Sequence, residues 1–356
     1  MDLVMAVQTF AKFLMISLLT FMANALFAEE LEKWDLHNNN TGDSDYLVYK
    51  LKYSGFITLF IWKDLADVAF ISNSQSEDFE GHTSCRLEMR LTTENYSFSE
   101  SLHPYRYRWR STVSPDLRKI FLVEEISEGK KEEYNINWVN WESDTIDYFR
   151  KRQLIVPETD VFAEEEYDNY FDAKVELPKP HWEKDGEKSM PSYFNHLPNI
   201  EDSHDYLVYD KSVEFDQITE AIDPLAMLYS ARWYNKNELN KPVFNVVHKD
   251  EIREYQLEIL GEEIINIGDQ EISTTKINIK RRNEKEAEEE GFISLWVSND
   301  ARRIPIRYEV QVRIGTMHVE LTEKSLHEYN QPKTCFTVAH SSNMWRTPQF
   351  LIKESP

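Results

Sequence analysis

The sequence is poor in basic residues and in glycine. Its 356 residues include 40 lysines and arginines against 63 aspartates and glutamates, so the formal net charge is −23. Nucleic-acid phosphates require a basic protein surface, and anionic lipid surfaces attract basic segments in the same way. The acidic balance therefore argues against nucleic acid as a partner and against docking on an anionic membrane surface.

Motifs of known cofactor and catalytic sites are also missing. The nine glycines form no phosphate-binding loop, and no G-x-S-x-G nucleophile elbow is present. The ten histidines show neither an H-x-x-x-H spacing nor a cluster with cysteine, so the sequence predicts no metal site and no cofactor. Two of the many carboxylates could form a glycosidase-type pair, but nothing in the sequence selects them.

Only one stretch is apolar enough to enter a bilayer. Residues 1–28 combine Lys12, an apolar run over 13–28 and small residues at its end, which is the form of a signal peptide. No later segment is long enough to span a membrane. We therefore predict an exported, periplasmic protein with no integral membrane segment after signal cleavage. The alternative is an uncleaved N-terminal anchor with the rest of the chain facing the periplasm.

Cysteine is nearly absent as well, with Cys85 and Cys335 as the only two. An oxidising compartment would let them pair, and the resulting long loop closure could stabilise the fold by about 2–4 kcal/mol. The alternative is two separate thiols, with Cys85 a small residue of the core.

Alternating strand patterns, by contrast, are abundant. Even positions are apolar and odd positions polar along 306–314, and the same period of two runs through 46–53, 85–91 and 105–110. The phase flips at Gly315, which requires a bulge or a tight turn. Together these patterns predict a mainly β fold, either a strongly curved antiparallel sheet or an incomplete β-barrel, with one packed helix.

That helix is predicted at about residues 223–235. Asp223 is a favoured N-cap and Pro224 fits the first turn. The helical spacing of apolar residues defines one buried face. This face consists of Leu225, Leu228, Tyr229, Arg232 and Trp233.

Two segments depart from the strand pattern. Residues 151–215 contain five prolines and acidic clusters, which predicts a long irregular insertion with a short strand at 206–209. Residues 331–356 are a predicted C-terminal tail with one strand at 334–338. The β-rich domain is accordingly predicted to span residues 29–330.

Several short motifs carry a resemblance to a known family. They are the pattern Asp300-x-Arg302-x-x-Pro305, a following strand with Gly315-x-x-x-Val319-x-Leu321, the helix with Asp223 and Arg232, the segment 261–276, and a tyrosine-rich first strand followed by Gly55. Over residues 45–321, apart from the insertion, the chain resembles the bacterial exported family called domain of unknown function 3108. The resemblance implies an exported antiparallel β-rich domain and no catalytic residues.

Four residues are candidate ligand contacts. Arg232 lies on the apolar face of the predicted helix, where a structural ion pair with Glu309, Asp300 or Asp223 would satisfy it. Alternatively, it is a fixed cation that grips an anionic headgroup or a sugar acid. The other three candidates are the aromatic residues Tyr107, Trp109 and Trp138.

Those aromatic residues belong to a set that alternates with a row of arginines. The set comprises Tyr105, Tyr107, Trp109, Tyr134, Ile136 and Trp138, and the row comprises Arg106, Arg108 and Arg110. The aromatic side is either core or the lining of an apolar groove that could hold an acyl chain. The arginine row is either a solvated face paired with acids or a contact with an anionic ligand.

The pattern of abundant aromatic strand surface without a catalytic constellation favours a non-catalytic protein. We expect a periplasmic binding or carrier protein for an amphipathic envelope component, a lipid or glycolipid. One alternative is an enzyme acting on envelope polysaccharide, with His181, Tyr193 and His196 of the insertion as candidates. The other alternative is a structural partner-binding module.

Overall fold

The computed structural model describes most of the predicted domain. It covers residues 34, 36, 44–55, 58, 62–102, 104–129, 133–153, 205–216, 218–234, 242–248, 251–282, 293–312, 315–329 and 335–336. The predicted signal peptide, most of the predicted insertion with His181, Tyr193 and His196, and most of the C-terminal tail lie outside the described residues.

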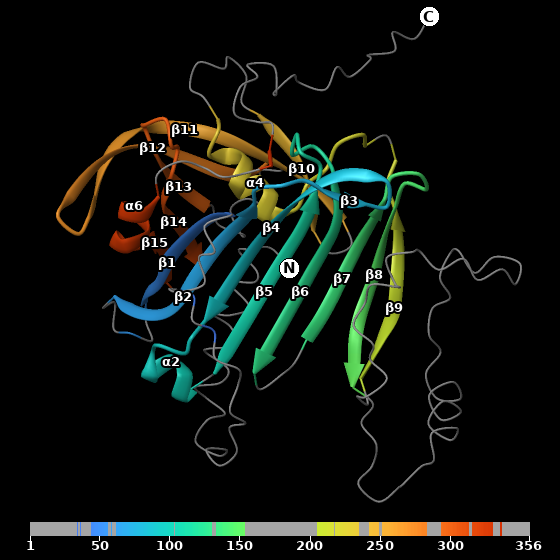
Figure 1. Ribbon diagram of the computed structural model, residues 1–356, viewed down its shortest axis with the longest axis horizontal. Coiled ribbons are helices and arrows are strands. Elements are labelled where there is room, and N and C mark those ends of the chain that lie inside the picture. Colours follow the sequence, from blue (N-terminus) through green and yellow to red (C-terminus); the bar gives the residue numbers. More distant parts are fainter. Residues whose placement is uncertain are drawn as a thin grey trace, which may run out of the picture.

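The described chain forms one 15-stranded antiparallel sheet that does not close into a barrel (Figure 1). Its strands are β1 (Ser44–Gly55), β2 (Lys63–Asn73), β3 (Glu77–Phe79), β4 (His82–Thr92), β5 (Tyr105–Val113), β6 (Ile120–Gly129), β7 (Glu133–Asn140), β8 (Thr145–Gln153), β9 (Asp205–Glu214), β10 (Val243–His248), β11 (Glu251–Ile267), β12 (Gln270–Arg281), β13 (Ile293–Ser298), β14 (Pro305–Val312) and β15 (Gly315–Leu321). The predicted mainly β fold class is confirmed.

The two halves of the chain meet at the middle of the sheet. The strand order is β10-β11-β12-β13-β14-β15-β1-β2-β4-β5-β6-β7-β8-β9, with β3 paired to β4 alone. Almost all neighbours are consecutive in sequence. The exceptions are β1, which pairs with β15, and β2, which pairs with β4 because β3 lies off the main order. The strands β9 and β10 therefore lie at opposite edges, although the chain connects them directly.

The connection between those edges crosses the sheet and holds its halves together. Ile120, at the start of β6, donates its backbone N–H to Ala221 over 2.8 Å. Ile222 donates to Asn245 of β10 over 2.9 Å and accepts from Val247 over 2.8 Å. One dipeptide thus hydrogen-bonds to strands from both halves, which requires the sheet to bend around it.

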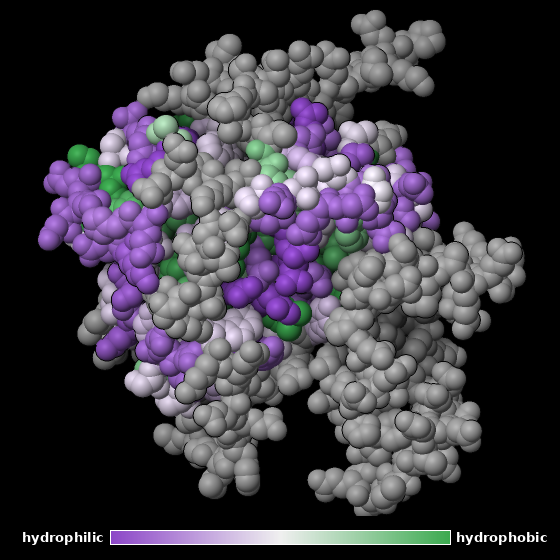
Figure 2. Space-filling model, viewed as in Figure 1, coloured by the Kyte–Doolittle hydropathy of each residue, from purple (hydrophilic) through white to green (hydrophobic). Residues whose placement is uncertain are grey.

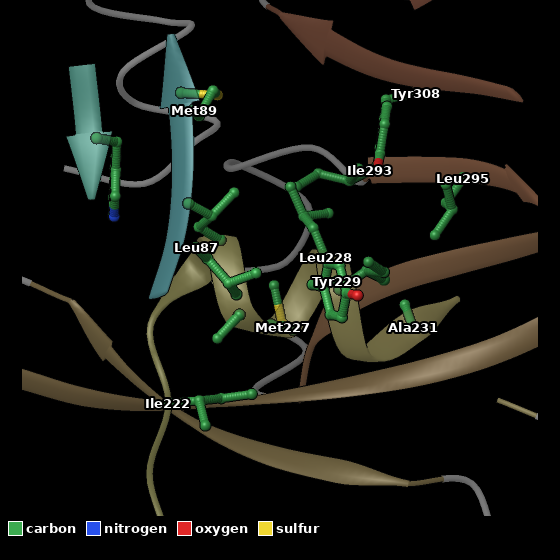
Figure 3. Close-up of a cluster of buried hydrophobic side chains, with 14 of the residues drawn as sticks. Leu87, Met89, Ile222, Met227, Leu228, Tyr229, Ala231, Ile293, Leu295 and Tyr308 are labelled. Atoms are coloured by element: carbon green, nitrogen blue, oxygen red, sulfur yellow. The ribbon is translucent and has the colours of Figure 1, made fainter. Parts of the chain in front are cut away.

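Helix α4 (Pro224–Ala231) follows this dipeptide and fills the inside of the bend. The Asp223 carboxylate caps it by accepting from the Ala226 N–H over 3.0 Å, as the sequence predicts. All eight residues of the helix are buried, so the predicted single apolar face was too narrow. Figure 3 shows its side chains between Leu87 and Met89 of β4 on one side and Ile293, Leu295 and Tyr308 on the other.

The helices and the insertion differ in part from those predicted. The helix ends at Ala231 rather than near residue 235, so Arg232 is its C-cap. The helices α2 (Ser97–Leu102) and α6 (Glu323–Glu328) were not predicted, because six residues are too short to show helical periodicity. The insertion is also shorter than predicted, because β8 and β9 pair from Thr145↔Glu214 to Gln153↔Asp205 and occupy both of its ends.

The C-terminal segment is tied to the early strands. The structure joins Cys85 of β4 to Cys335 by a disulfide that spans 250 residues, with a Cα–Cα distance of 6.0 Å. The backbone N–H of Cys335 donates to Asn73 over 3.1 Å, and the Phe336 ring lies 5.0 Å from that of Tyr229. Neither Cys335 nor Phe336 is in a strand, so the predicted strand at 334–338 is wrong at its two described residues.

The phase flip at Gly315 comes from a tight hairpin between β14 and β15, and a close backbone approach explains the glycine. Gly315 pairs with Gly55 of β1. A Cβ atom at position 315 would lie 2.8 Å from the Gly55 Cα and would also clash with the Ser54 carbonyl oxygen. Only glycine allows β1 and β15 to approach at this point.

We predict that Gly315→Ala destabilises the protein by about 1–3 kcal/mol, because the added methyl meets backbone that cannot rotate away. Gly261→Ala is the matched control, since φ is +155° at Gly261 and +159° at Gly315 but a Cβ at 261 meets nothing. The measurement is urea unfolding of both variants. Equal losses of stability would contradict the role given to the close approach.

We predict that purified protein contains no free thiol until it is reduced. Alkylation under denaturing conditions, followed by mass measurement, should add no label before reduction and two labels after it. The variant Cys85→Ser/Cys335→Ser should lose about 2–4 kcal/mol of stability through the freed loop. Two labels on the unreduced protein would show that the disulfide is absent.

Candidate functional site

Arg232 is not at the mouth of a groove but inside the molecule. Its side chain is 2% exposed, and its guanidinium donates to Asp45 Oδ2 over 2.8 Å, to the Tyr329 hydroxyl over 2.8 Å and to the Arg303 carbonyl over 3.1 Å. Burial would lower the pKa of Arg232, but Asp45 and the neighbouring tyrosines raise that pKa well above its usual value. Arg232 therefore stays charged as half of a structural ion pair.

The partner of Arg232 was predicted wrongly. Asp300 pairs instead with Arg302 over 2.6 Å, Glu309 pairs with His318 over 2.6 Å, and Asp223 caps α4. The true partner, Asp45, opens an apolar strand 187 residues away. An acidic residue at the start of a buried strand indicates that its carboxylate needs a cationic partner. The sequence alone does not identify that partner.

The space beside this ion pair is too small for an organic ligand. A cavity of about 20 Å³ is bounded by β1, β2, β4, α4 and β14 and has Asp45, Ser72 and Tyr229 among its lining residues. Ligand pockets usually measure about 300–1,000 Å³, whereas a space of this size accepts one water molecule. Around Arg232 the interior of the sheet is therefore packed core rather than a binding site.

Tyr107 and Trp109 also lie in the core, on the sheet face toward α4. The Trp109 indole donates to Asp223 Oδ2 over 2.8 Å, and the Ser111 hydroxyl donates to the same oxygen over 2.6 Å. Burial raises the pKa of Asp223, and these hydrogen bonds oppose that rise. Trp109 thus supports the helix N-cap, and Tyr107 is a buried core residue whose ring packs beside that of Trp109, so neither lines an open groove.

Trp138 lies on the opposite face of the sheet, so the predicted grouping of the three aromatic residues is wrong. The register pairs Thr112 with Leu122 and Leu122 with Trp138, which puts Trp138 on the side away from Trp109. Trp138, Tyr134 and Phe79 are half-buried and pack over Leu122, Ile136 and Phe149. We call these three half-buried residues the aromatic ledge.

The arginine row shares this outer face with the aromatic ledge, but its members differ. Arg106 is 2% exposed and donates to Glu100 Oε1 over 2.8 Å, so it is not part of a solvated face. Arg110 donates to Glu88 and Glu124, each over 3.3 Å. Arg90, directly opposite Arg108 on β4, contacts Glu88.

Arg108 differs from its neighbours. Among the residues that the structure describes, it donates no hydrogen bond and forms no ion pair. We call Arg90, Arg108 and Arg110, with Glu88 and Glu124, the arginine face. Burial would raise the pKa of Glu88, but Arg90, Arg110 and Arg108 lower it, so this carboxylate remains ionised and engaged.

The described side chains show no grouping of three or more His, Cys, Asp or Glu residues that could hold a metal ion. None of the helices in the described part of the chain is long and apolar enough to cross a bilayer. On the side that Figure 2 views, the surface of the described residues is mainly hydrophilic, with hydrophobic residues in small separate patches.

Comparison with protein families bears on the second half of the sheet. Residues 199–322 match the model of the family described as "Protein of unknown function (DUF3108)". This segment belongs to the DUF3108 family. It contains β9, α4 and the strands from β10 to β15, together with four of the five motifs that suggested the resemblance. The DUF3108 match begins at residue 199 rather than 45, so the arginine face and the aromatic ledge lie outside it.

Comparisons with curated proteins and with solved structures identify no function. A search of curated proteins found no match. Among solved structures, the chain is similar to the beta-barrel-like protein of domain of unknown function DUF1849 from Brucella abortus. The identity is 9%, the TM-score is 0.36, and the alignment covers 78% of this chain and 95% of that chain. A TM-score of this size carries no inference about function.

We predict that Arg232→Leu destabilises the fold by about 3–5 kcal/mol, because it leaves the Asp45 carboxylate buried without its cation. The double variant Asp45→Asn/Arg232→Leu should recover part of that loss. Arg118→Leu is the control, since the Arg118 side chain is 38% exposed and pairs with exposed Glu220, and it should cost at most about 1 kcal/mol. Chemical unfolding of the three variants measures these changes in stability. A loss of stability for Arg232→Leu no larger than that for Arg118→Leu would contradict the structural role of Arg232.

Proposed function

We propose that this protein is exported to the periplasm and binds an amphipathic envelope component, a lipid or glycolipid, without catalysing a reaction on it. The observation that carries the proposal is the outer face of β4 to β7. There, cationic side chains of the arginine face lie beside the aromatic ledge, within one continuous sheet surface. Such a surface offers one molecule both a polar and an apolar contact.

The layout of this surface follows from the strand register. Arg90 of β4, Arg108 of β5, Ile126 of β6 and Tyr134 of β7 lie opposite one another in that order. Neighbouring strands are about 4.8 Å apart, so the row changes from guanidinium to apolar side chain over about 10 Å. An amphipathic molecule lying across the strands would meet its charged contact first and its apolar contact next.

The packing around Arg232 supports an external binding surface. The cavity beside Arg232 is far too small for an acyl chain, so a ligand of this class requires another part of the molecule. The aromatic side chains of the ledge are half-buried and already fixed by the packing beneath them. Rigid aromatic contacts bind with a small entropic cost.

Export is supported by two features of the chain. Residues 13–28 have the apolar character of a signal peptide, and the disulfide between Cys85 and Cys335 is of the kind that persists in oxidising compartments. The acidic net charge of −23 disfavours docking on an anionic membrane as a whole. The net charge therefore favours binding of single ligand molecules over docking of the whole protein on a membrane.

We predict that the protein binds dodecyl phosphate and dodecyl maltoside below their micelle concentrations. Both probes share an alkyl chain, and Ile126→Asn should weaken binding of both by about tenfold, because it removes apolar area next to the ledge. Ile264→Asn is the matched control, since Ile264 lies on β11 and is 67% exposed. The affinity of that control should equal that of the unmodified protein.

Isothermal titration calorimetry measures these affinities, and native mass spectrometry of the purified protein reports any co-purified lipid. If neither probe binds the unmodified protein and no lipid co-purifies, the carrier proposal fails. A protein rather than a lipid recovered from envelope extract would favour the partner-binding module instead. The candidate residues of the alternative enzyme, His181, Tyr193 and His196, lie outside the described residues.

A further inference from the structure

We infer that Arg108 is an anion-recognition residue, which selects amphipathic ligands whose headgroup is a phosphate or a carboxylate. This inference rests on the proposed function, because it names the headgroup chemistry that the same surface accepts. Nothing in the family match bears on it, because the match covers residues 199–322 only.

The first observation is a like-charge pair across two strands. Arg90 and Arg108 are direct cross-strand partners in the β4–β5 register. Side chains at such positions have Cβ atoms about 5 Å apart, and like charges placed there destabilise a sheet. A sequence that keeps two arginines at this spacing has a local conflict, and conflicts of this kind concentrate at functional positions.

The second observation is that the local carboxylates are already engaged. Arg90 contacts Glu88, while Arg110 donates to Glu88 and to Glu124 over 3.3 Å each. The Tyr134 hydroxyl also donates to Glu124, over 3.2 Å. Glu128, on the same face of β6, is the cross-strand partner of Arg106. Arg108 is thus the arginine of this face that forms no ion pair with a described residue.

The surroundings of Arg108 limit what can neutralise it. Across β6 its direct neighbour is Ile126, which offers no charge. Burial and the Glu124 charge raise the pKa of Tyr134, so that hydroxyl stays neutral and acts as a donor rather than as an anion. Glu128, the next acid on this face of β6, lies opposite Arg106 rather than Arg108, so the guanidinium of Arg108 is available to an anion of a bound molecule.

The chemistry of the guanidinium indicates the class of that molecule. Its planar array of donors matches the two oxygens of a carboxylate or a phosphate in a paired arrangement, which is stronger than a hydrogen bond to a neutral hydroxyl. The half-buried position of Arg108 reduces screening by water and salt. The apolar neighbours Ile126 and Tyr134 then place the alkyl part of the ligand on the side away from Arg90.

The test compares three probes that share a twelve-carbon chain: dodecyl phosphate, dodecanoate and dodecyl maltoside. We expect the unmodified protein to bind one or both anionic probes about tenfold more tightly than the maltoside, and Arg108→Gln to remove that preference. Binding of the maltoside should change less than about twofold. A stronger preference for phosphate indicates a phospholipid-type headgroup, and a stronger preference for carboxylate indicates a fatty acid or a sugar acid.

Two controls separate recognition from folding. Arg118→Gln removes a partly exposed arginine that pairs with Glu220, and it should leave all three affinities unchanged. Arg108→Gln removes a side chain without hydrogen-bond partners among the described residues and relieves its repulsion with Arg90, so its melting temperature should not fall.

The outcomes distinguish this inference from the proposed function. If all three probes bind the unmodified protein equally and Arg108→Gln changes none of the affinities, Arg108 does not select the headgroup, while the carrier proposal stands. If no probe binds, the carrier proposal fails and the role of Arg108 fails with it. A lower melting temperature for Arg108→Gln than for Arg118→Gln would show that Arg108 has a structural role, and that result would also overturn the inference.

Discussion

Both ends of helix α4 are fixed by buried charged groups, and the arrangement of the sheet depends on this. At the first end, Asp223 accepts hydrogen bonds from Trp109 and Ser111 of β5. At the other end, Arg232 donates to Asp45 of β1 and to Tyr329 after β15. The helix is only eight residues long, too short to be stable alone, so these contacts and its burial hold it. Because strands from both halves of the chain bind the same helix, the sheet must bend around it.

Burying these charges is costly unless every group is paired, and here each one has hydrogen-bond partners. Replacing one partner of such a pair costs more than the pair itself contributes, since the remaining charge is stranded in the core. The disulfide and the packing of Phe336 on Tyr229 add a covalent and an apolar tie at the same place. Beside these ties the described residues leave a cavity of only about 20 Å³.

The sequence predicted what depends on neighbouring residues and missed what depends on distant ones. Alternation in β4, β5 and β14 and the cap at Asp223 are local, and they were confirmed. The side of the sheet on which Trp138 lies depends on the register of β6, whose two faces both carry apolar and polar residues, so alternation alone could not align it with Trp109. The pairing of Arg232 with Asp45 is likewise a product of topology, since β1 reaches the helix only because it joins β15 to β2.

The alternation of β5 assigns two separate tasks to one strand. Its odd positions, Trp109 and Ser111, hold the N-cap of α4, and its even positions carry Arg108 and Arg110 on the outer face. Successive side chains on a strand are separated by the sheet itself, so a change on one face leaves the packing of the other largely intact. Under the proposed function, stability and ligand selection could then vary independently along the nine residues of β5. The same backbone that bends around the helix holds the outer arginines at the spacing set by the strand register, and a fixed spacing of this kind is what the proposed recognition of a small anionic headgroup requires.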